Sequence, residues 1–195
     1  MPRQKQYSEQ EVIDKAVNLF WKQGYKSTSI RELEKEMGIN QFSIYSSFGS
    51  KKGVFLRALK QYKEQVKTVF LSGLIHSEGH IEDIRRFLMD FVDSVQSGRT
   101  PNGCLMANTA MDLGAHDKEV KVQLQLFFEL LKDVFIEVLT KAQANNEIKP
   151  NADVERYANY LLGSTEGLAI TAKVLQPEQL QDFIDITMTS INGGE

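Results

Sequence analysis

The chain has 195 residues, of which 42% are hydrophobic and 25% are charged, and its formal net charge is −3. This composition is ordinary for a folded protein in water, so a wholly disordered chain is not expected. The sequence has no apolar stretch near the roughly 18 residues that a membrane helix needs, no apolar segment of a secretory signal near its start, and a single cysteine, which excludes an internal disulfide. These features predict a protein of the reducing cytoplasm.

Capping residues and apolar stripes predict helices along the whole chain. The first helix follows the capping-box pattern Ser8–Glu11 and ends at Gly24. The other expected helices cover residues 28–37, 41–48, 51–72, 80–97, 103–113, 118–145, 153–174 and 177–191. No alternating run is long enough to indicate a strand. The expected fold class is therefore all-α, with about nine helices.

The charges are unevenly distributed. Residues 1–62 hold 11 Lys and Arg against 6 Asp and Glu, a net charge of +5, whereas residues 63–195 hold 12 against 20, a net charge of −8. A basic segment over residues 1–62 and an acidic segment over residues 63–195 indicate that the first segment binds a polyanion. The alternative is chance clustering of charges, which composition alone does not exclude.

Residues 28–48 have the pattern of a helix-turn-helix. Gly38 permits the sharp turn between the two helices. The apolar residues expected to fix the angle between these helices are Ile30, Leu33, Met37, Ile39, Ile44 and Phe48. The exposed face of the second helix then carries amide, hydroxyl and aromatic groups and no acidic group, in Gln41, Phe42, Ser43, Tyr45, Ser46 and Ser47. Such groups suit base edges and phosphates.

In this context residues 8–55 resemble the DNA-binding domain of the TetR family of bacterial transcriptional repressors. The resemblance rests on ordered segments at consistent spacing, namely 16–20 with 24–25, 28–33, 37–39, 44–48 and 49–51. It covers about a quarter of the chain. It implies a three-helix DNA-binding domain over residues 1–50 and a larger helical ligand-binding and dimerisation domain over residues 51–195.

The resemblance also implies DNA-contacting residues, which are Thr28, Ser29, Gln41, Phe42, Ser43, Tyr45, Ser46, Ser47 and Lys51. Thr28, Tyr45 and Lys51 match positions at which such proteins contact phosphates. Gln41 is a good partner for adenine. Arg3 and Lys5 are candidates for an arm that reaches a minor groove.

Two positions depart from the family pattern. Phe42 replaces a small residue that many relatives have, and either contacts a thymine methyl group or packs against the preceding helix. Ser47 replaces a common histidine, which puts the second phosphate contact in doubt.

For dimerisation the sequence offers two small residues at helical spacing, Gly163 and Gly167. Small residues four apart let two helices approach closely, either between two subunits or inside one. The residues expected at a two-fold interface are Gly163, Ser164, Gly167, Leu180, Phe183, Ile184 and Thr187. A four-helix contact of this kind would place two recognition helices on one near-palindromic operator.

The expected ligand-binding residues are apolar and aromatic residues of the second domain, namely Phe87, Phe91, Cys104, Met106, Phe127, Phe128, Leu131, Tyr157 and Tyr160. Each of them is equally well read as an ordinary core residue. The stretch 102–108 resembles the Gly-Cys opening of one branch of these regulators, in which some members sense electrophiles or oxidants. Cys104 is therefore either such a sensor or a packing residue.

The sequence as a whole predicts a homodimeric repressor that binds operator DNA and is released by a small-molecule effector. One alternative is a redox- or electrophile-responsive regulator that acts through Cys104. Another is an all-helical enzyme, which the lack of a catalytic constellation disfavours. No cofactor is expected. No metal site is expected either, because Gly79 interrupts the helix that would align His76 with His80.

Overall fold

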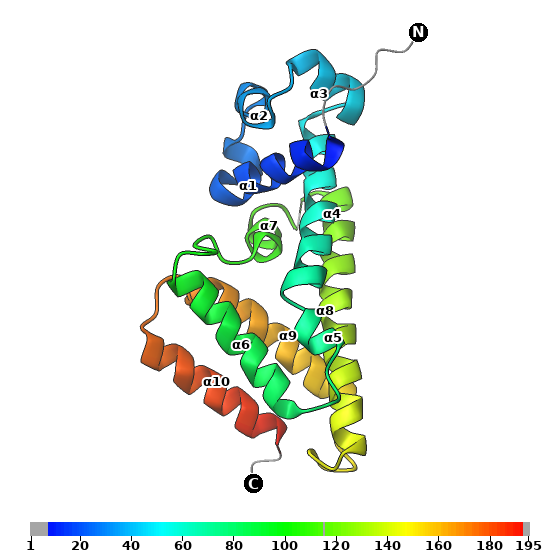
Figure 1. The fold of residues 1–195 in the computed structure, drawn as a ribbon, viewed down its shortest axis with the longest axis vertical. Helices are drawn as coiled ribbons and strands as arrows, with labels where there is room; N and C mark the ends of the chain where they lie inside the picture. The colour runs from blue at the N-terminus through cyan, green and yellow to red at the C-terminus, as the bar shows by residue number, and fades with distance from the viewer. Residues whose placement is uncertain (1–7, 115, 193–195) are drawn as a thin grey trace. The chain divides into compact units, whose positions relative to one another are not determined.

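The computed structural model describes residues 8–114 and 116–192, and these form ten helices and no strand (Figure 1). The helices are α1 (Glu9–Ser27), α2 (Ile30–Met37), α3 (Gln41–Phe48), α4 (Lys51–Val69), α5 (Ser72–Ile75), α6 (Ile81–Gln96), α7 (Leu105–Leu113), α8 (Lys118–Ala144), α9 (Val154–Thr171) and α10 (Pro177–Ile191). The all-α prediction is confirmed. The short helix α5 was not expected, because the apolar stripe continues across the bend through Leu71 and Leu74, both buried.

The chain packs as two compact units. The first holds Met1–Gln65 together with Asn108–Leu124, and the second holds Val66–Ala107 together with Gln125–Glu195. Compared with the boundary expected at residue 50, the first unit also includes α4 as far as Gln65 and a segment from the middle of the chain. The chain therefore passes between the units inside α4, α7 and α8.

Aromatic side chains hold α1 against α4 in the first unit. The ring centroids of Phe20 and Phe55 lie 4.8 Å apart in an edge-to-face arrangement, and the Tyr25 ring lies 4.8 Å from that of Phe55. Phe20 and Phe55 are each 1% exposed. The aliphatic residues buried in this unit include Ile13, Val17, Leu33, Met37, Ile44 and Leu59. Because rings of this size dominate the buried area of a small unit, this contact sets the position of α1 on α4.

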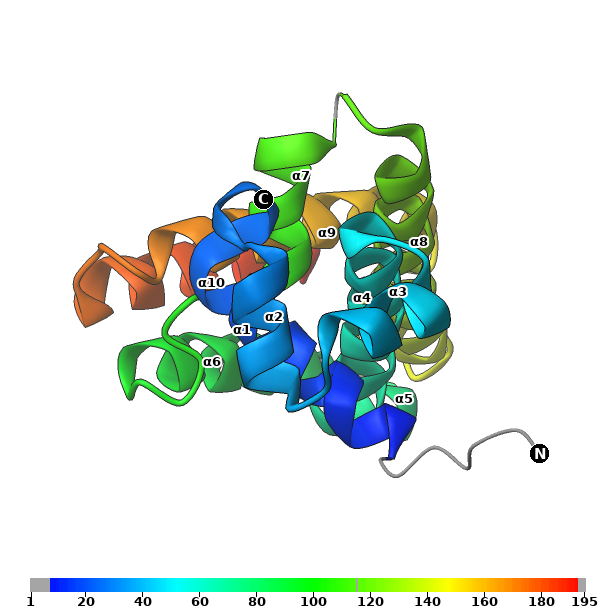
Figure 2. The same ribbon diagram turned by 90° about the horizontal axis from the view of Figure 1, so that it is seen from above.

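Local capping defines α2, which lies beside α1, and α3, which lies next to α2 (Figures 1 and 2). Ser29 and Glu32 form the predicted capping box at the start of α2. Gly38 ends α2 in the left-handed conformation, with φ 71° and ψ 24°, and Asn40 caps α3 through the Ser43 N–H. These features confirm the helix-turn-helix geometry.

A second glycine in this unit has a steric role that the sequence did not reveal. A Cβ atom placed on Gly53 would lie 1.9 Å from the carbonyl oxygen of Phe48. Only glycine therefore lets the end of α3 approach the first turn of α4 this closely. Ser50 caps that turn by accepting the Gly53 N–H at 3.0 Å.

The second unit has its core among α6, α9, α10 and the adjoining part of α8. Its buried residues include Ile84, Leu88, Phe135, Leu139, Leu161, Leu168, Ile184 and Met188. The helices α6, α9 and α10 lie side by side in both views (Figures 1 and 2). None of the described helices is long and apolar enough to cross a membrane.

Glu166 of α9 is half-buried and carries a fully buried carboxyl oxygen. Its Oε2 atom is buried and has no hydrogen-bond partner among the described residues, and burial raises the pKa of its carboxyl group to about 7. Desolvation disfavours the charged carboxylate, so the folded state holds a proton that the unfolded chain releases above its ordinary pKa of 4.5.

The aromatic packing of the first unit can be tested with a matched pair of substitutions. Phe55→Ala leaves a cavity between α1 and α4, so the free energy of unfolding in urea should fall by about 3–5 kcal/mol. Phe42→Ala removes the same side chain at a position that is 80% exposed. It should change that free energy by less than about 0.5 kcal/mol. Equal losses in the two variants would contradict the assigned core.

The burial of Glu166 predicts a pH dependence of stability. Because the folded state binds the extra proton, the free energy of unfolding should fall from pH 4.5 to 7 and then level off, by up to about 3 kcal/mol. Glu166→Gln should remove this fall, whereas the exposed-site variant Glu129→Gln should retain it. Urea titrations at pH 5, 6, 7 and 8 and fixed protein concentration measure the difference. Parallel pH curves for the wild type and Glu166→Gln would refute it.

Candidate nucleic-acid interface

The exposed face of α3 carries four residues at helical spacing. Gln41, Phe42, Tyr45 and Ser46 stand at positions i, i+1, i+4 and i+5, and all four are exposed, with Phe42 at 80% and Tyr45 at 45%. Ile44 on the opposite face is fully buried. The helix contains no acidic residue. This face is a surface of amide, hydroxyl and aromatic groups.

Phe42 does not pack against the preceding helix, because a side chain that is 80% exposed has little contact with its neighbours. Of the two readings of this residue, the structure leaves only an outward-facing ring. An exposed phenyl ring is unfavourable in water and suits an apolar partner such as a methyl group.

The three candidate serines of α3 and the serine that caps α2 differ in their exposure and in the hydrogen bonds that they make. Ser46 is exposed, and its hydroxyl lies 3.5 Å from the Ser43 carbonyl. Ser43 and Ser47 are half-buried, and the Ser43 N–H is already bonded to the Asn40 cap. At the start of α2, the Ser29 N–H donates to the Glu32 carboxylate at 2.7 Å, and the Ser29 hydroxyl oxygen accepts the Glu32 N–H at 3.2 Å. The hydrogen bonds that Ser29 donates hold the pKa of Glu32 below its ordinary value.

Thr28 and Lys51 have intramolecular partners where phosphate contacts were expected. Thr28 is 1% exposed, and its hydroxyl donates to the Gly24 carbonyl at 2.6 Å. The ammonium group of Lys51 donates to the carbonyls of Tyr25 (2.9 Å) and Thr28 (2.8 Å) and lies 4.3 Å from the centre of the Tyr25 ring. Both side chains therefore hold the turn between α1 and α2.

Ion pairs attach the segment 108–124 to the helices of the first unit. Lys26 at the end of α1 binds the carboxylate of Asp112 at 2.6 Å. Lys52 at the start of α4 binds Asp117 at 2.9 Å and also binds Glu119. The carboxylates of Glu119 and Asp117 raise the pKa of Lys52, and the Lys52 ammonium group lowers the pKa of Asp117. The sequence does not reveal this link, because the two lysines and their partners are far apart in the chain and charged surface residues are common.

The expected ligand-binding residues do not form one group. Cys104, Met106, Phe127 and Leu131 are buried, while Phe87, Phe91 and Phe128 are half-buried. Phe127 and Phe128 contact each other edge to face, and Phe87 contacts Phe135.

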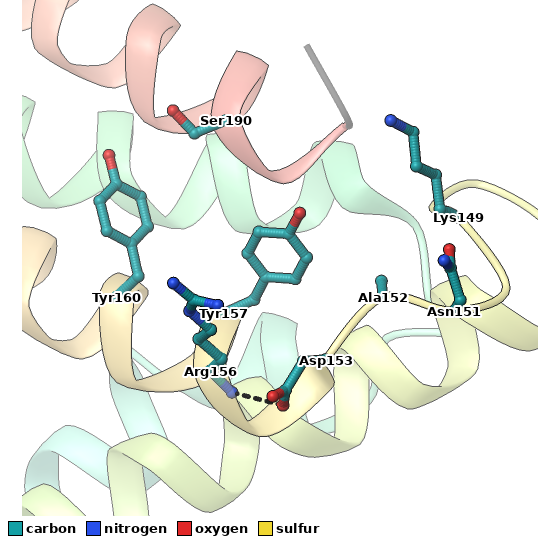
Figure 3. A pocket seen from close by; sticks show the side chains of 8 residues that line it. All are labelled: Lys149, Asn151, Ala152, Asp153, Arg156, Tyr157, Tyr160 and Ser190. Atoms are coloured by element: carbon teal, nitrogen blue, oxygen red, sulfur yellow. Dashed lines mark hydrogen bonds between the residues drawn. The ribbon is translucent and has the colours of Figure 1, made fainter. Parts of the chain in front are cut away.

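Tyr157 packs against the same core as Phe87 and Phe91, and together with Tyr160 it also lines a surface groove of about 540 Å³. The other residues that line it are Lys149, Asn151, Ala152, Asp153, Arg156 and Ser190 (Figure 3). None of these six was a candidate from the sequence, because Lys149 and Ser190 are brought together only by the fold.

Burial divides the residues expected at the dimer interface. Ser164, Leu180, Ile184 and Thr187 have exposed fractions of 6%, 1%, 1% and 1%, so they pack inside the protomer and do not form part of its surface. The expectation that these four residues lie at the interface was wrong. Both faces of α10 carry apolar residues, and periodicity alone does not distinguish the inner face from the outer one.

The outer face of α9 and α10 carries the remaining candidates. Gly163 is exposed, Gly167 is half-buried and Phe183 is 40% exposed. A Cβ atom on Gly167 would lie 4.0 Å from the Phe183 ring, so these two residues belong to one continuous surface. Ile170 (43% exposed) and Ile186 (66% exposed) add to this apolar surface and were missed from the sequence.

Arg3 and Lys5 lie outside the described residues. Among the described residues, no group of three His, Cys, Asp or Glu is placed to hold a metal ion. The His80 side chain instead bonds Glu147 at 2.7 Å, which raises the pKa of His80, and the His76 ring bonds the Ser72 carbonyl oxygen.

Two family models match the chain. Residues 12–58 match the model described as bacterial regulatory proteins, tetR family, and residues 81–186 match the model described as tetracyclin repressor-like, C-terminal domain. Among curated proteins, the uncharacterized HTH-type transcriptional regulator YezE of Bacillus subtilis (strain 168) is 27% identical over 98% of this chain and 100% of its own. The HTH-type transcriptional repressor ComR of Escherichia coli (strain K12) is 26% identical over 97% of this chain and 90% of its own.

A solved structure has the same fold over nearly the whole chain. A cysteine mutant of the TetR family transcriptional regulator CifR, complexed with 26-bp double-strand operator DNA, superposes with a TM-score of 0.82. It is 24% identical in sequence, and the match covers 96% of this chain and 99% of the other.

Proposed function

The chain belongs to the tetR family of bacterial regulatory proteins, and from this premise we propose that it is a cytoplasmic homodimeric repressor that a small effector releases from its operator. Its class is that of a DNA-binding transcriptional regulator. The proposal concerns how it binds, pairs and responds.

The exposed face of α3 carries the proposal. In the proposed complex this helix enters the major groove, with Gln41 bonded to an adenine edge and the Phe42 ring against a thymine methyl group. The Tyr45 hydroxyl contacts a phosphate. The absence of carboxylates on α3 avoids repulsion from the DNA backbone.

Thr28 and Lys51 have a supporting role in this proposal. Their hydrogen bonds to backbone carbonyls hold the turn that positions α2, and α2 in turn supports α3. Lys51 still places a positive charge at the start of α4, which favours nearby phosphates at long range. Tyr45 is therefore the side chain that we assign to direct phosphate contact, since it is exposed and its hydroxyl has no partner among the described residues.

We assign the dimer contact to the outer face of α9 and α10, formed by Gly163, Gly167, Ile170, Phe183 and Ile186. Contiguous exposed apolar side chains are typical of protein interfaces, and the glycines allow close approach of a second helix. A two-fold dimer presents two copies of α3, which fit half-sites roughly 34 Å apart on DNA.

Effector release requires communication between the two compact units. The chain crosses between them in α4, α7 and α8, and the pairs formed by Lys26 and Lys52 attach segment 108–124 to the DNA-binding helices. We propose that effector binding in the second unit shifts these crossings and changes the separation of the two recognition helices. A coupling of about 1.4 kcal/mol suffices for tenfold release.

The burial of Cys104 favours a small-molecule effector over an oxidant. Its side chain is 6% exposed, whereas redox-sensing thiols are accessible to their oxidants. A persistent response to electrophiles in Cys104→Ser would show that the thiol is not the sensor. We propose no enzymatic activity.

Operator binding can be tested by titrating the dimer with a duplex selected from a random library, over a range of salt concentrations. A steep fall of affinity with salt is expected from phosphate contacts. Tyr45→Phe should weaken binding about tenfold on all sequences, because one phosphate hydrogen bond is lost. Gln41→Ala should relax base preference at one position by about 5- to 100-fold.

The matched control is Gln125→Ala, which removes the same side chain from an exposed position on α8. It should leave both affinity and base preference unchanged. No binding by the wild type at low salt would overturn the proposal, and an unaltered base preference in Gln41→Ala would overturn the assignment of that residue.

The dimer contact predicts a specific effect of charge on α10. Ile186→Glu buries a carboxylate in the interface and should raise the dimer dissociation constant at least about a hundredfold. Val69→Glu places the same charge at a position of similar exposure, 70% against 66%, on α4, and should leave the dimer intact. Sedimentation equilibrium measures both. A dimer that survives Ile186→Glu with unchanged affinity places the interface elsewhere.

A further inference from the structure

The turn between α2 and α3 is bonded at both of its ends to one residue, Glu34 of α2. The backbone carbonyl of Glu34 accepts the Gly38 N–H at 3.1 Å, where α2 ends. Its carboxylate oxygen Oε1 accepts the Gln41 N–H, also at 3.1 Å, in the first turn of α3. This side chain therefore joins the supporting helix α2 to the recognition helix α3.

The first turn of α3 has two side-chain acceptors with different consequences. The Asn40 side chain accepts the Ser43 N–H at 2.8 Å, which is a cap made by α3's own flanking residue. The Glu34 carboxylate comes from another helix. The Glu34 bond therefore sets where the first turn of α3 lies relative to α2, which a local cap cannot do.

The position of the Gln41 backbone matters because we assign the Gln41 side chain to an adenine edge, so the inference rests on the proposed function. That side chain is exposed, and no hydrogen bond holds it to another described residue. A binding group has to be placed within about 0.5 Å of its productive geometry. For Gln41 this placement depends on its backbone, and Glu34 holds the backbone N–H.

Glu34 also puts a negative charge beside the N-terminus of α3. Within the described part of the chain, no cation forms an ion pair with this half-buried carboxylate. A helix N-terminus attracts phosphates through its N–H groups and its dipole. A phosphate that approaches the first turn of α3 instead meets a carboxylate, and the Gln41 N–H is already bonded. The charge therefore opposes binding to DNA of any sequence.

We propose that Glu34 is the positioning residue for base readout by Gln41, and that its charge separately lowers the affinity for all DNA. The hydrogen bond acts on the preference for one base pair, because it fixes the Cα from which the Gln41 amide extends. The charge acts on phosphates, which are the same in every sequence. The two contributions can therefore be separated by experiment.

Glu34→Gln removes the charge and keeps an acceptor oxygen at the same side-chain length. It should preserve the base preference. It should also raise the affinity for operator and non-operator duplexes alike by about three- to tenfold at low salt, and this gain should shrink as salt is added. A lost base preference, or an unchanged affinity for non-operator DNA at low salt, would overturn the proposal.

Glu34→Asp keeps the charge on a side chain that is one methylene shorter and does not reach the Gln41 N–H. It should leave the affinity for non-operator DNA unchanged. It should reduce the preference at the base pair that Gln41→Ala affects by at least about fivefold. An unchanged preference at that base pair, or a loss confined to other base pairs, would contradict the positioning role.

The matched control is Glu36→Asp, which shortens an exposed carboxylate of the same helix that bonds no other described residue. It should retain the base preference of the wild type. Fluorescence anisotropy titrations of the selected operator, its single-base variants and a non-operator duplex measure all of these proteins. A relaxed preference in Glu36→Asp would show that the effect is a general one of shortened acids on α2, and would overturn the assignment to Glu34.

Amide hydrogen exchange at Gln41 gives a readout that needs no DNA. The Gln41 N–H should exchange at least about tenfold faster in Glu34→Asp than in the wild type or in Glu34→Gln. Equal rates in the three proteins would show that the bond does not hold the helix. If the wild type binds duplexes without selectivity, the proposed function fails, whatever the exchange rates. If the wild type is selective and Glu34→Asp equals it, only the role of Glu34 fails.

Discussion

The contact between Phe20 and Phe55 is the constraint on which the DNA-binding unit depends. It holds α1 against α4 with both rings almost fully buried, and Tyr25 packs on the same ring of Phe55. α2 contacts α1, and α3 contacts α2. The position of α3 therefore depends on this aromatic contact. α4 then continues beyond Gln65 into the second unit. Close packing of these rings fixes the position of α1 on α4.

The polar groups around this core are used in two ways. Thr28 and Lys51 use their hydrogen-bonding capacity inside the protein, on the carbonyls of the turn that follows α1. Gln41 and Tyr45 present theirs to solvent, on the exposed face of α3. The exposed face of α3, which we propose as the reading surface, therefore rests on a framework that buried and charge-assisted contacts fix.

The second unit combines an apolar interior with two polar features of opposite sign. Glu166 buries an unpartnered carboxylate oxygen in α9, and the surface groove at the start of the same helix gathers two cations, Lys149 and Arg156, without carboxylate partners among the described residues. The buried carboxylate oxygen of Glu166 costs stability unless the group is protonated.

Much of the fold follows from local signals. The capping box of Ser29 and Glu32, the left-handed Gly38 and the Asn40 cap all stand where the sequence predicts them, because capping depends on residues within one turn of each other. The expected face of α3 also follows, since helical periodicity together with a buried Ile44 determines which side chains point outward.

The sequence by itself thus determined the helices, their caps and the residues available on the recognition helix. Tertiary structure alone decided which apolar residues of α9 and α10 face solvent, that segment 108–124 joins the DNA-binding helices through Lys26 and Lys52, and that Arg156 shares a surface groove with Lys149 and Ser190. The physical reason is the separation along the chain of the residues that interact. Caps and turns are hydrogen bonds between near neighbours in the chain, whereas interior, surface and groove are defined by which distant helices pack together.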